Sequence, residues 1–269
     1  MINRHTRAIS VTSGKGGVGK TTVVVNTALA LSQQGKQVLI LDADLGMANV
    51  DIFFGIRAHG TIADVLEGKK SVREVLVEVT NGVDLLSGGS GLSAMGRINH
   101  FQRRALFDEL TNLPKPYDCV LIDTAPGIGD NVLYFNSASD ETVVIITPDP
   151  ASLTDSYALI KVLHQEYKEN HFRIICNMVR DADDGRQLFA KFNDICQRFL
   201  NVGLDFIGSV PADEQLKIAA RQQRPILKHA NSSACASAIR NIAKNMSTSA
   251  RPEGKQGIRA FWGHLVGVA

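Results

Sequence analysis

The chain has 269 residues and a net charge of +2 at neutral pH, with 44% hydrophobic and 21% charged residues. These values are ordinary for a soluble globular protein, and the length corresponds to one large domain or to a domain with a tail. No apolar run is long enough to span a bilayer, and the small net charge neither requires nor excludes binding to nucleic acid. The four cysteines form no CxxC pair, which indicates reduced core thiols in a cytoplasmic protein: Cys119, Cys176, Cys196 and Cys235.

A glycine-rich segment near the N-terminus fits the phosphate-loop pattern, in which two glycines bracket four residues and are followed by Lys and Ser or Thr. An apolar run over 8–11 predicts a strand before it, and residues 23–32, which lack Gly and Pro, predict a helix after it. The glycines allow the backbone N–H groups to surround an anion, Lys20 can reach the β- and γ-phosphates, and the Thr21 hydroxyl can bind Mg²⁺. The predicted nucleotide-binding residues are Gly14, Lys15, Gly16, Gly17, Val18, Gly19, Lys20, Thr21 and Thr22.

Two carboxylates follow the next predicted strand. Residues 38–41 are a continuous apolar run, typical of a buried parallel strand, and Asp42 and Asp44 come directly after it. Open α/β sheets bind ligands beyond the carboxyl ends of their strands. Asp44 could therefore orient an attacking water, and Asp42 could act on the water shell of the metal. The alternative for either residue alone is a helix cap or a turn.

A third aspartate ends the run 117–123, which has the shape of a Walker B strand. Asp123 can hold Mg²⁺ through a bound water. The residues after it, 124–130, predict a flexible segment whose backbone could sense the γ-phosphate. The alternative is a plain strand followed by a turn.

The rest of the chain continues to alternate strands and helices. Strands are predicted over 83–86, 142–146, 172–176 and 204–210, and helices from 61, over 100–113, from 154, from 185 and over 230–246. Asn177 ends one of these strands, and Pro211, Ala212 and Asp213 follow another. On the residues alone, Asn177 could be a turn residue and Asp213 could cap the next helix.

The C-terminal residues differ in composition. Residues 247–257 are rich in Ser, Thr, Pro, Gly, Lys and Arg and predict a flexible linker after a domain over 1–246. Residues 258–269 predict an amphipathic tail helix whose apolar face is Ile258, Phe261, Trp262, Leu265 and Val266. Such a helix could lie in a membrane interface. The alternative is that it packs on its own core or on a partner protein.

The second lysine of the glycine run, Lys15, makes the phosphate loop resemble the deviant Walker A motif of the ParA/MinD group of P-loop ATPases. Residues 44–51, 123–130, 154–161 and 185–192 are similar to the FlhG/FleN branch of that group, the flagellar-number ATPases. The resemblance implies a three-layer α/β/α P-loop NTPase fold with a mostly parallel central sheet.

The resemblance also implies roles for single residues. In this family the first lysine of the loop, here Lys15, reaches across a dimer interface to the nucleotide of the partner. An asparagine at the position of Asn177 binds the edge of adenine, and residues Pro211, Ala212 and Asp213 lie beside the base. Together with the reasoning above, Lys15, Lys20 and Asp44 are then the catalytic residues, and Thr21, Asp42 and Asp123 hold Mg²⁺, partly through water.

The function implied is a slow, partner-stimulated ATPase that hydrolyses ATP to ADP and phosphate and forms an ATP-dependent homodimer. Such proteins restrain flagellar number and placement, together with an FlhF-like GTPase or a flagellar transcription activator. From the resemblance we expect a cytoplasmic protein that associates reversibly with the inner membrane through its tail, and no direct DNA binding. Because only seven residues precede the predicted strand, we expect no GTPase-stimulating N-terminal extension.

Related functions are the alternatives. A cell-division MinD shares the tail, and only the partner distinguishes it. A ParA-type DNA-partitioning ATPase needs a basic surface, for which Lys244, Arg251, Lys255 and Arg259 near the tail are candidates. An iron–sulfur carrier of the same fold would need a cysteine pair that bridges a dimer, and no CxxC motif is present. A binding module without hydrolysis is disfavoured by the complete set of Lys20, Thr21, Asp44 and Asp123.

Overall fold

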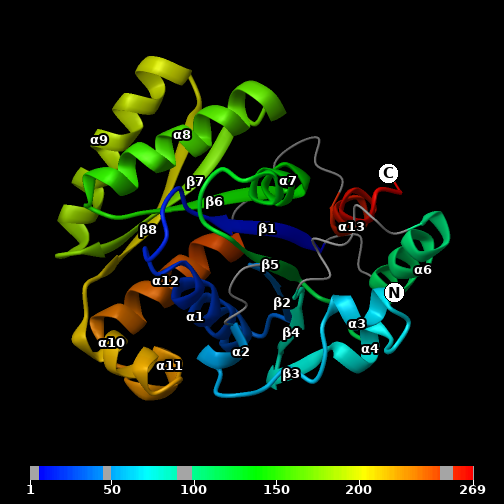
Figure 1. Cartoon of the computed structure of the whole chain (residues 1–269). Helices are drawn as coiled ribbons and strands as arrows, with labels where there is room; N and C mark the ends of the chain where they lie inside the picture. The colour runs from blue at the N-terminus through cyan, green and yellow to red at the C-terminus, as the bar shows by residue number, and fades with distance from the viewer. Residues whose placement is uncertain (1–5, 45–49, 90–98, 249–256, 269) are drawn as a thin grey trace.

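The centre of the molecule is an eight-stranded sheet with the strand order β3-β4-β2-β5-β1-β6-β7-β8 (Figure 1). The computed structural model describes residues 6–44, 50–89, 99–248 and 257–268. All neighbouring strands are parallel except the antiparallel pair β3 and β4. The strands are β1 (Arg7–Thr12), β2 (Val38–Ala43), β3 (Val77–Thr80), β4 (Val83–Ser87), β5 (Cys119–Thr124), β6 (Glu141–Ile146), β7 (His171–Val179) and β8 (Gly203–Pro211).

Helices cover both faces of the sheet, as Figure 1 shows. One face carries α1, α11 and α12, and the other carries α6, α7, α8, α9 and α13. The helices are α1 (Lys20–Gln33), α2 (Val50–Phe53), α3 (Ile62–Leu66), α4 (Val72–Val75), α6 (His100–Thr111), α7 (Asp130–Ala138), α8 (Pro150–Tyr167), α9 (Ala182–Leu200), α10 (Glu214–Arg221), α11 (Ile226–His229), α12 (Ala234–Thr248) and α13 (Ile258–Val266). This arrangement confirms the predicted α/β/α fold.

The inner strands β2, β4, β5 and β6 are buried along their whole length because helices cover both faces of the sheet, whereas the edge strands β3 and β8 are partly exposed. In β2, Leu39 and Leu41 pack into the core beneath α6, whereas Ile40, between them, packs into the core beneath α1. Side chains alternate between the two faces of a strand, so a continuous apolar run supplies both cores at once. The four cysteines are buried and form no disulfide, which confirms the predicted core thiols.

Several helix ends differ from the sequence prediction. The helix expected from Thr154 begins at Pro150, because the Asp149 side chain accepts a hydrogen bond from the N–H of Ala151 and caps it. The helix expected from Gly185 begins at Ala182, where Asp181 is the cap. In both cases a capping aspartate, Asp149 or Asp181, marks the start of the helix, and the prediction did not use it.

The last helix of the predicted domain is also displaced. It begins at Ala234 rather than Ala230, because the hydroxyl of Ser233 accepts a hydrogen bond from the N–H of Ala236 at 3.1 Å. It ends at Thr248, so the predicted boundary between residues 246 and 247 lies inside α12. Most of the predicted linker, residues 249–256, lies outside the described residues.

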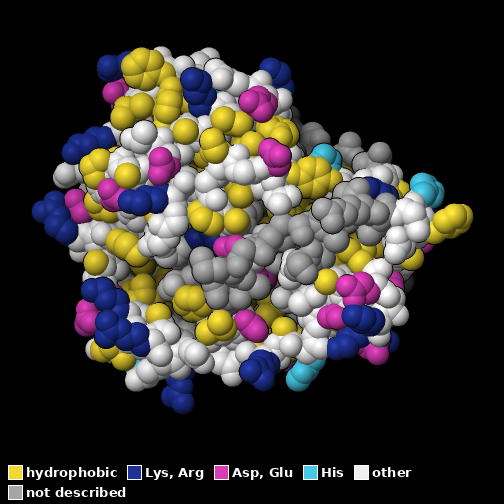
Figure 2. Space-filling view, viewed as in Figure 1, with side chains coloured by type: hydrophobic (Ala, Val, Ile, Leu, Met, Phe, Trp, Pro, Cys, Tyr) yellow, Lys and Arg dark blue, Asp and Glu magenta, His cyan; other side chains and the backbone are white. Residues whose placement is uncertain are grey.

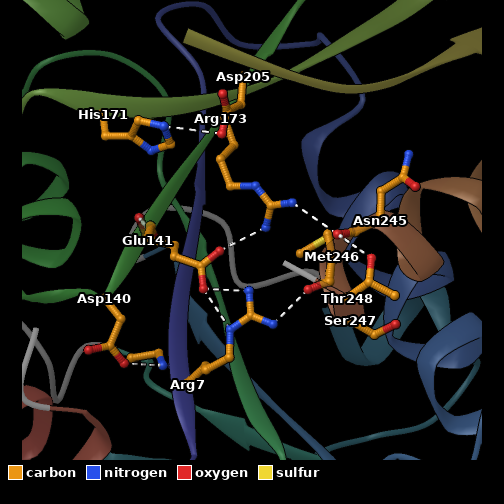
Figure 3. A network of polar contacts seen from close by, with 12 residues as sticks. Arg7, Asp140, Glu141, His171, Arg173, Asp205, Asn245, Met246, Ser247 and Thr248 are labelled. Carbon is orange, nitrogen blue, oxygen red and sulfur yellow. Dashed lines mark hydrogen bonds and ion pairs between the residues drawn. The ribbon is translucent and has the colours of Figure 1, made fainter. Parts of the chain in front are cut away.

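A buried ion-pair network joins three strands to the end of α12 (Figure 3). Glu141 of β6 accepts hydrogen bonds from Nε of Arg7 at 2.6 Å and from a guanidinium nitrogen of Arg173 at 2.7 Å. The two arginines also donate to the carbonyl oxygens of Met246 and Asn245. Because the side chain of Glu141 is only 2% exposed, this charge depends on both arginines.

The tail helix α13 is packed on its own domain, between α6 and α7. Its five predicted membrane-facing side chains are each at most 3% exposed and belong to the core that covers β1, β2 and β5: Ile258, Phe261, Trp262, Leu265 and Val266. Asp140 accepts a hydrogen bond from the N–H of Gly257 at one end, and Arg103 donates to the carbonyl of Val266 at the other. In this conformation the apolar stripe is buried by protein, as the alternative of packing on its own core describes, and membrane contact stays a prediction.

Among the described residues, no helix is long and apolar enough to cross a membrane.

Candidate nucleotide-binding site

The phosphate loop joins β1 to α1 and is shaped by its glycines. Gly17 and Gly19 have φ angles of 78° and 84°, which other residues rarely adopt, and Gly19 is the N-cap of α1. Gly14 has a different constraint, because a Cβ there would lie 2.1 Å from the carbonyl carbon of Asp155 in α8. A glycine loop at the start of a helix is an anion-binding arrangement.

Of the three residues predicted to hold Mg²⁺, Thr21 lies in the first turn of α1 and the two aspartates lie near the ends of two adjacent strands. Asp42 of β2 is the register partner of Asp123 of β5. Asp123 is 1% exposed and accepts hydrogen bonds from Nζ of Lys20 and from Oγ1 of Thr21, both at 2.7 Å. Burial raises the pKa of Asp123, and the Lys20 ammonium offsets part of that rise.

These oxygen atoms fit a magnesium ion. Within the described part of the chain, no three His, Cys, Asp or Glu residues come together as a metal cluster. Mg²⁺ does not need one, because it usually takes one or two protein ligands and completes its shell with water and phosphate oxygens. The hydroxyl of Thr21 and the carboxylate of Asp123 would supply the protein ligands.

Asp42 and Asp44 have different surroundings. Asp42 is 2% exposed and accepts hydrogen bonds from the N–H groups of Asp44 and Val50, both at 3.2 Å. Burial, and next the charge of Asp123, raise the pKa of Asp42 to about 7. Asp44 lines the cavity beside the phosphate loop, where the predicted role in orienting water requires it. The rest of the predicted 44–51 segment is only partly described, because residues 45–49 lie outside the described residues.

A cavity of about 530 Å³ extends from the phosphate loop to the loop after β8. This volume lies in the range of small-molecule sites. Its lining includes most of the phosphate loop together with residues that the prediction named at the far end: Asp44, Asn177, Pro211, Ala212 and Asp213. The structure therefore brings the two halves of the predicted site together.

Asn177 lies against the phosphate loop and within β7, so it is not a turn residue. It is 2% exposed, and its Nδ2 donates to the carbonyl oxygen of Val18 at 2.7 Å. Its Oδ1 is buried with no hydrogen-bond partner among the described residues. A buried acceptor without a donor is uncommon, and the 6-amino group of adenine is a donor of the kind it lacks.

The backbone hydrogen bonds at the end of β8 limit how Pro211 and Ala212 could contact a base. The N–H of Ala212 donates to the carbonyl of Val179 at 2.8 Å, and Pro211 has no N–H. Any backbone contact to a base from these two residues would therefore use their carbonyl oxygens. Asp213 caps α10 by accepting from the N–H of Gln215 at 2.8 Å, as the alternative had it.

Lys15 has a partner in its own chain. Its Nζ forms an ion pair with the carboxylate of Asp149, the N-cap of α8, and the two side chains are 42% and 43% exposed. The prediction did not name Asp149, because it placed the start of this helix four residues later. An Asp-Pro pair at a helix start was the signal that could have found it.

The segment after Asp123 is connected to the phosphate loop by a backbone hydrogen bond, from the N–H of Gly127 to the carbonyl of Ser13 at 2.9 Å. It leads directly into α7, which begins at Asp130. This segment therefore lies between the phosphate loop and α7, and α7 contacts the tail helix through Tyr134.

A strand, a glycine loop with Lys20 and Thr21, a helix, and an acidic residue on the adjacent strand together define a P-loop NTPase.

Comparison with known proteins gives the family. A family model described as ParA, NUBPL iron-transfer P-loop NTPase, matches residues 4–247. The antiactivator FleN of Pseudomonas aeruginosa is 38% identical over 256 residues, which cover 95% of this chain and 91% of FleN. The flagellum site-determining protein YlxH of Helicobacter pylori is 31% identical over 267 residues, or 97% of this chain and 90% of YlxH.

A solved structure of a relative supports the same family. The septum site-determining protein MinD of Pyrococcus horikoshii, complexed with Mg-ADP, matches with a TM-score of 0.67 at 26% identity, covering 90% of this chain and 96% of that one. The chain belongs to the ParA/MinD family of P-loop NTPases, and like the members of that family it is an ATPase.

Proposed function

We propose that this protein is a switch that dimerises on ATP and regulates the number or placement of flagella. The observation that carries the proposal is Lys15 inside the phosphate loop of a chain similar to FleN over 95% of its length. The names of the two relatives, an antiactivator and a flagellum site-determining protein, support the flagellar role.

The chemistry proposed is transfer of the γ-phosphoryl group to water. Lys20 and the N–H groups of the phosphate loop hold the phosphates, and Asp44 orients the attacking water. In the structure the ammonium group of Lys20 pairs with the carboxylate of Asp123. When a nucleotide binds, this ammonium group would contact phosphate oxygens in place of the carboxylate. Mg²⁺, when bound at Thr21 and Asp123, would neutralise charge on the phosphates.

Hydrolysis would need the dimer because Lys15 acts on the nucleotide of the partner. Preorganised positive charge aimed at the transferred group stabilises the transition state. In the described conformation Lys15 is paired with Asp149 of its own chain, which is a resting position for this lysine. Turnover is expected to be slow until a partner stimulates it.

Reversible membrane association through α13 is part of the proposal and requires release of the helix. The docked helix leaves the indole N–H of Trp262 buried without a partner among the described residues, and such a group costs about 1–3 kcal/mol. Release of α13 would expose its apolar side chains, and these side chains can enter a membrane interface instead of water. Two tails in one dimer would strengthen the attachment through effective concentration.

The proposed partners are an FlhF-like GTPase or a flagellar transcription activator. They follow from the similarity to FleN and YlxH rather than from a surface of this chain.

A second candidate, a ParA-type DNA-partitioning ATPase, has one observation in its favour. Figure 2 shows Lys and Arg side chains at the lower left, the region where Figure 1 draws α10 and α11. The exposed basic residues of these two helices and of the turn between them, of which Lys217 lines the cavity, are Lys217, Arg221, Arg224 and Lys228. Of the basic residues named near the tail, Lys244 and Arg259 lie on different helices, α12 and α13, and residues 251 and 255 lie outside the described residues. DNA binding that weakens steeply with salt would favour this candidate.

The dimer is tested by light scattering with Mg-ADP or with a non-hydrolysable ATP analogue. We expect a monomer with ADP and a dimer with the analogue, and only a monomer for Lys20→Ala in both. A wild-type protein that stays monomeric with the bound analogue would contradict the switch.

The flagellar role is tested genetically. In a flagellated source bacterium, loss of the gene should change the number of flagella per cell, and the Lys20→Ala allele should not restore it.

The tail is tested by sedimentation with vesicles that contain anionic lipid. We expect pelleting with the ATP analogue and not with ADP. The double variant Tyr134→Cys, His264→Cys can be crosslinked with a short bismaleimide, because the two rings are stacked with centroids 4.5 Å apart. Crosslinking should abolish pelleting, and the same variant before crosslinking is the control. Equal pelleting in both would mean that α13 does not leave the domain.

A further inference from the structure

Met178 has a backbone conformation that its place in the fold does not explain. Among the described residues, four that are not glycine have positive φ: Lys168, Met178, Asn201 and Gln223. Lys168 and Asn201 are C-caps of α8 and α9, and Gln223 closes the turn after α10. Met178, with φ of 59°, lies inside β7 and ends no helix. A residue in this region is strained, and such strain gathers at functional sites.

A β-bulge accompanies this conformation. The register between β7 and β8 shifts between Asn177 and Val179, so that Met178 is the extra residue. A bulge beside an active site redirects a side chain that regular pairing would place elsewhere. Here Asn177 is directed under the phosphate loop and is 2% exposed, whereas Met178 is 47% exposed and lines the cavity.

Both side chains meet the phosphate loop at the same residue. A Cβ built on Gly19 would lie 2.5 Å from Nδ2 of Asn177 and 3.6 Å from the methyl carbon Cε of Met178. The bulge therefore places an amide and a thioether side by side at the end of the loop from which α1 starts.

The cavity has a polar and an apolar end. Beyond the phosphate loop, its apolar side chains include Met178, Pro211, Ala212 and Leu216. Asn177 contributes the buried acceptor that a base edge can satisfy. A flat base whose edge meets Asn177 needs an apolar surface along its face, and an exposed methionine suits this because its thioether is flexible and polarizable.

We infer that Met178 is a specificity-determining residue that packs against the face of the purine base of the bound nucleotide. The strained bulge in β7 is the device that presents it, one residue after the amide that reads the edge. This inference rests on the proposed nucleotide site and not on the proposed dimer or flagellar role.

The test compares two ligands, Mg-ADP and inorganic pyrophosphate, by calorimetry. ADP is used because the proposed dimer forms with ATP, so contacts across a dimer do not enter. The Met178→Asn variant removes the thioether with a residue that accepts the left-handed conformation. Met178→Leu keeps an apolar side chain and is the matched control.

We expect Met178→Asn to weaken ADP binding about three- to tenfold and to leave pyrophosphate binding unchanged within about twofold. Met178→Leu should stay within about twofold of the wild type for both ligands. Equal weakening of both ligands by Met178→Asn would overturn the inference, because Met178 would then only support the phosphate loop. Unchanged ADP binding together with weaker ATP-driven dimerisation would also overturn it and would assign Met178 to the partner's surface.

Absence of the proposed base site would give a different result, because it would already be seen in the wild-type protein. A wild-type protein that binds ADP no more tightly than pyrophosphate, which carries the same two phosphates without the base, would show that no base pocket exists, which overturns the proposed base site and this inference together. A wild type that prefers ADP, with variants that keep the full preference, overturns the inference alone.

Discussion

The two lysines of the phosphate loop are in different environments, and this difference follows their predicted roles. Lys20 is buried and paired with Asp123, in the position from which it can reach a phosphate. Lys15 is half exposed and paired with Asp149 across the surface. A buried lysine serves its own site, whereas an exposed one on the rim of the cavity can act on a second molecule.

The resting pair of Lys15 gives the first prediction. Asp149→Asn removes the charge that holds Lys15 within its own chain and keeps a side chain that can cap α8. We expect the dimer to form at lower protein concentration with the ATP analogue, with a dissociation constant about two- to tenfold smaller, because each dimer releases two such exposed pairs. Light scattering across a dilution series measures it.

The matched control is Asp155→Asn, on the same helix but without an ion pair to Lys15. The difference between Asp149→Asn and the wild type should also shrink at high salt, because exposed charges are screened. A dimer weakened by Asp149→Asn would instead mean that this carboxylate binds Lys15 of the partner.

At the level of the elements, local patterns were sufficient for the phosphate loop and for the seven parallel strands, whereas the short antiparallel strand β3 was not predicted. Asp42, Asp44 and Asp123 were predicted from strand ends alone, because parallel strands bring their carboxyl ends to one edge. Helix starts were less accurate where a cap and not an apolar residue sets the boundary, as at Asp149. The bulge at Met178 could not be predicted, because it depends on how β7 pairs with β8.

The tail helix shows a different limit. An apolar stripe predicts that one face of α13 is buried, and it is the same stripe whether the surroundings are lipid or protein. Only the groove between α6 and α7, which forms from distant parts of the chain, decides where the helix lies in this conformation.

Trp262 allows this choice to be followed in solution, because it is the only tryptophan and is 0% exposed. We expect weak acrylamide quenching of its fluorescence with ADP and about severalfold stronger quenching with the ATP analogue, since release places the indole in water. Anionic vesicles should then protect it again. Quenching that stays weak when light scattering reports a dimer would show that the helix remains docked; Trp262→Phe gives the background.

For the whole molecule, the network around Glu141 connects β1, β6 and β7 with the carbonyl end of α12 (Figure 3). Glu141→Gln would leave Arg7 and Arg173 buried beside a neutral side chain. We expect the free energy of unfolding to fall by about 3–5 kcal/mol, measured by urea denaturation. Glu166→Gln, at an exposed position of α8, is the control and should change stability little. A loss equal to that of the control would mean that solvent reaches the two arginines.

The central claim is that each nucleotide is hydrolysed with the lysine of the other protomer. The most direct measurement is the ATPase rate of two inactive variants mixed before ATP is added. Lys15→Ala keeps Asp44 but supplies no lysine to its partner, and Asp44→Ala supplies the lysine but cannot orient water. Each alone should be nearly inactive, with Asp44→Ala bound to ATP and held as a dimer.

In an equal mixture about half of the dimers pair one variant with the other, and each of these has one complete site. The account therefore predicts recovery to about a quarter of the wild-type rate in the mixture. A mixture no more active than the sum of the two variants, while light scattering shows that mixed dimers have formed, would contradict it and place Lys15 in its own site.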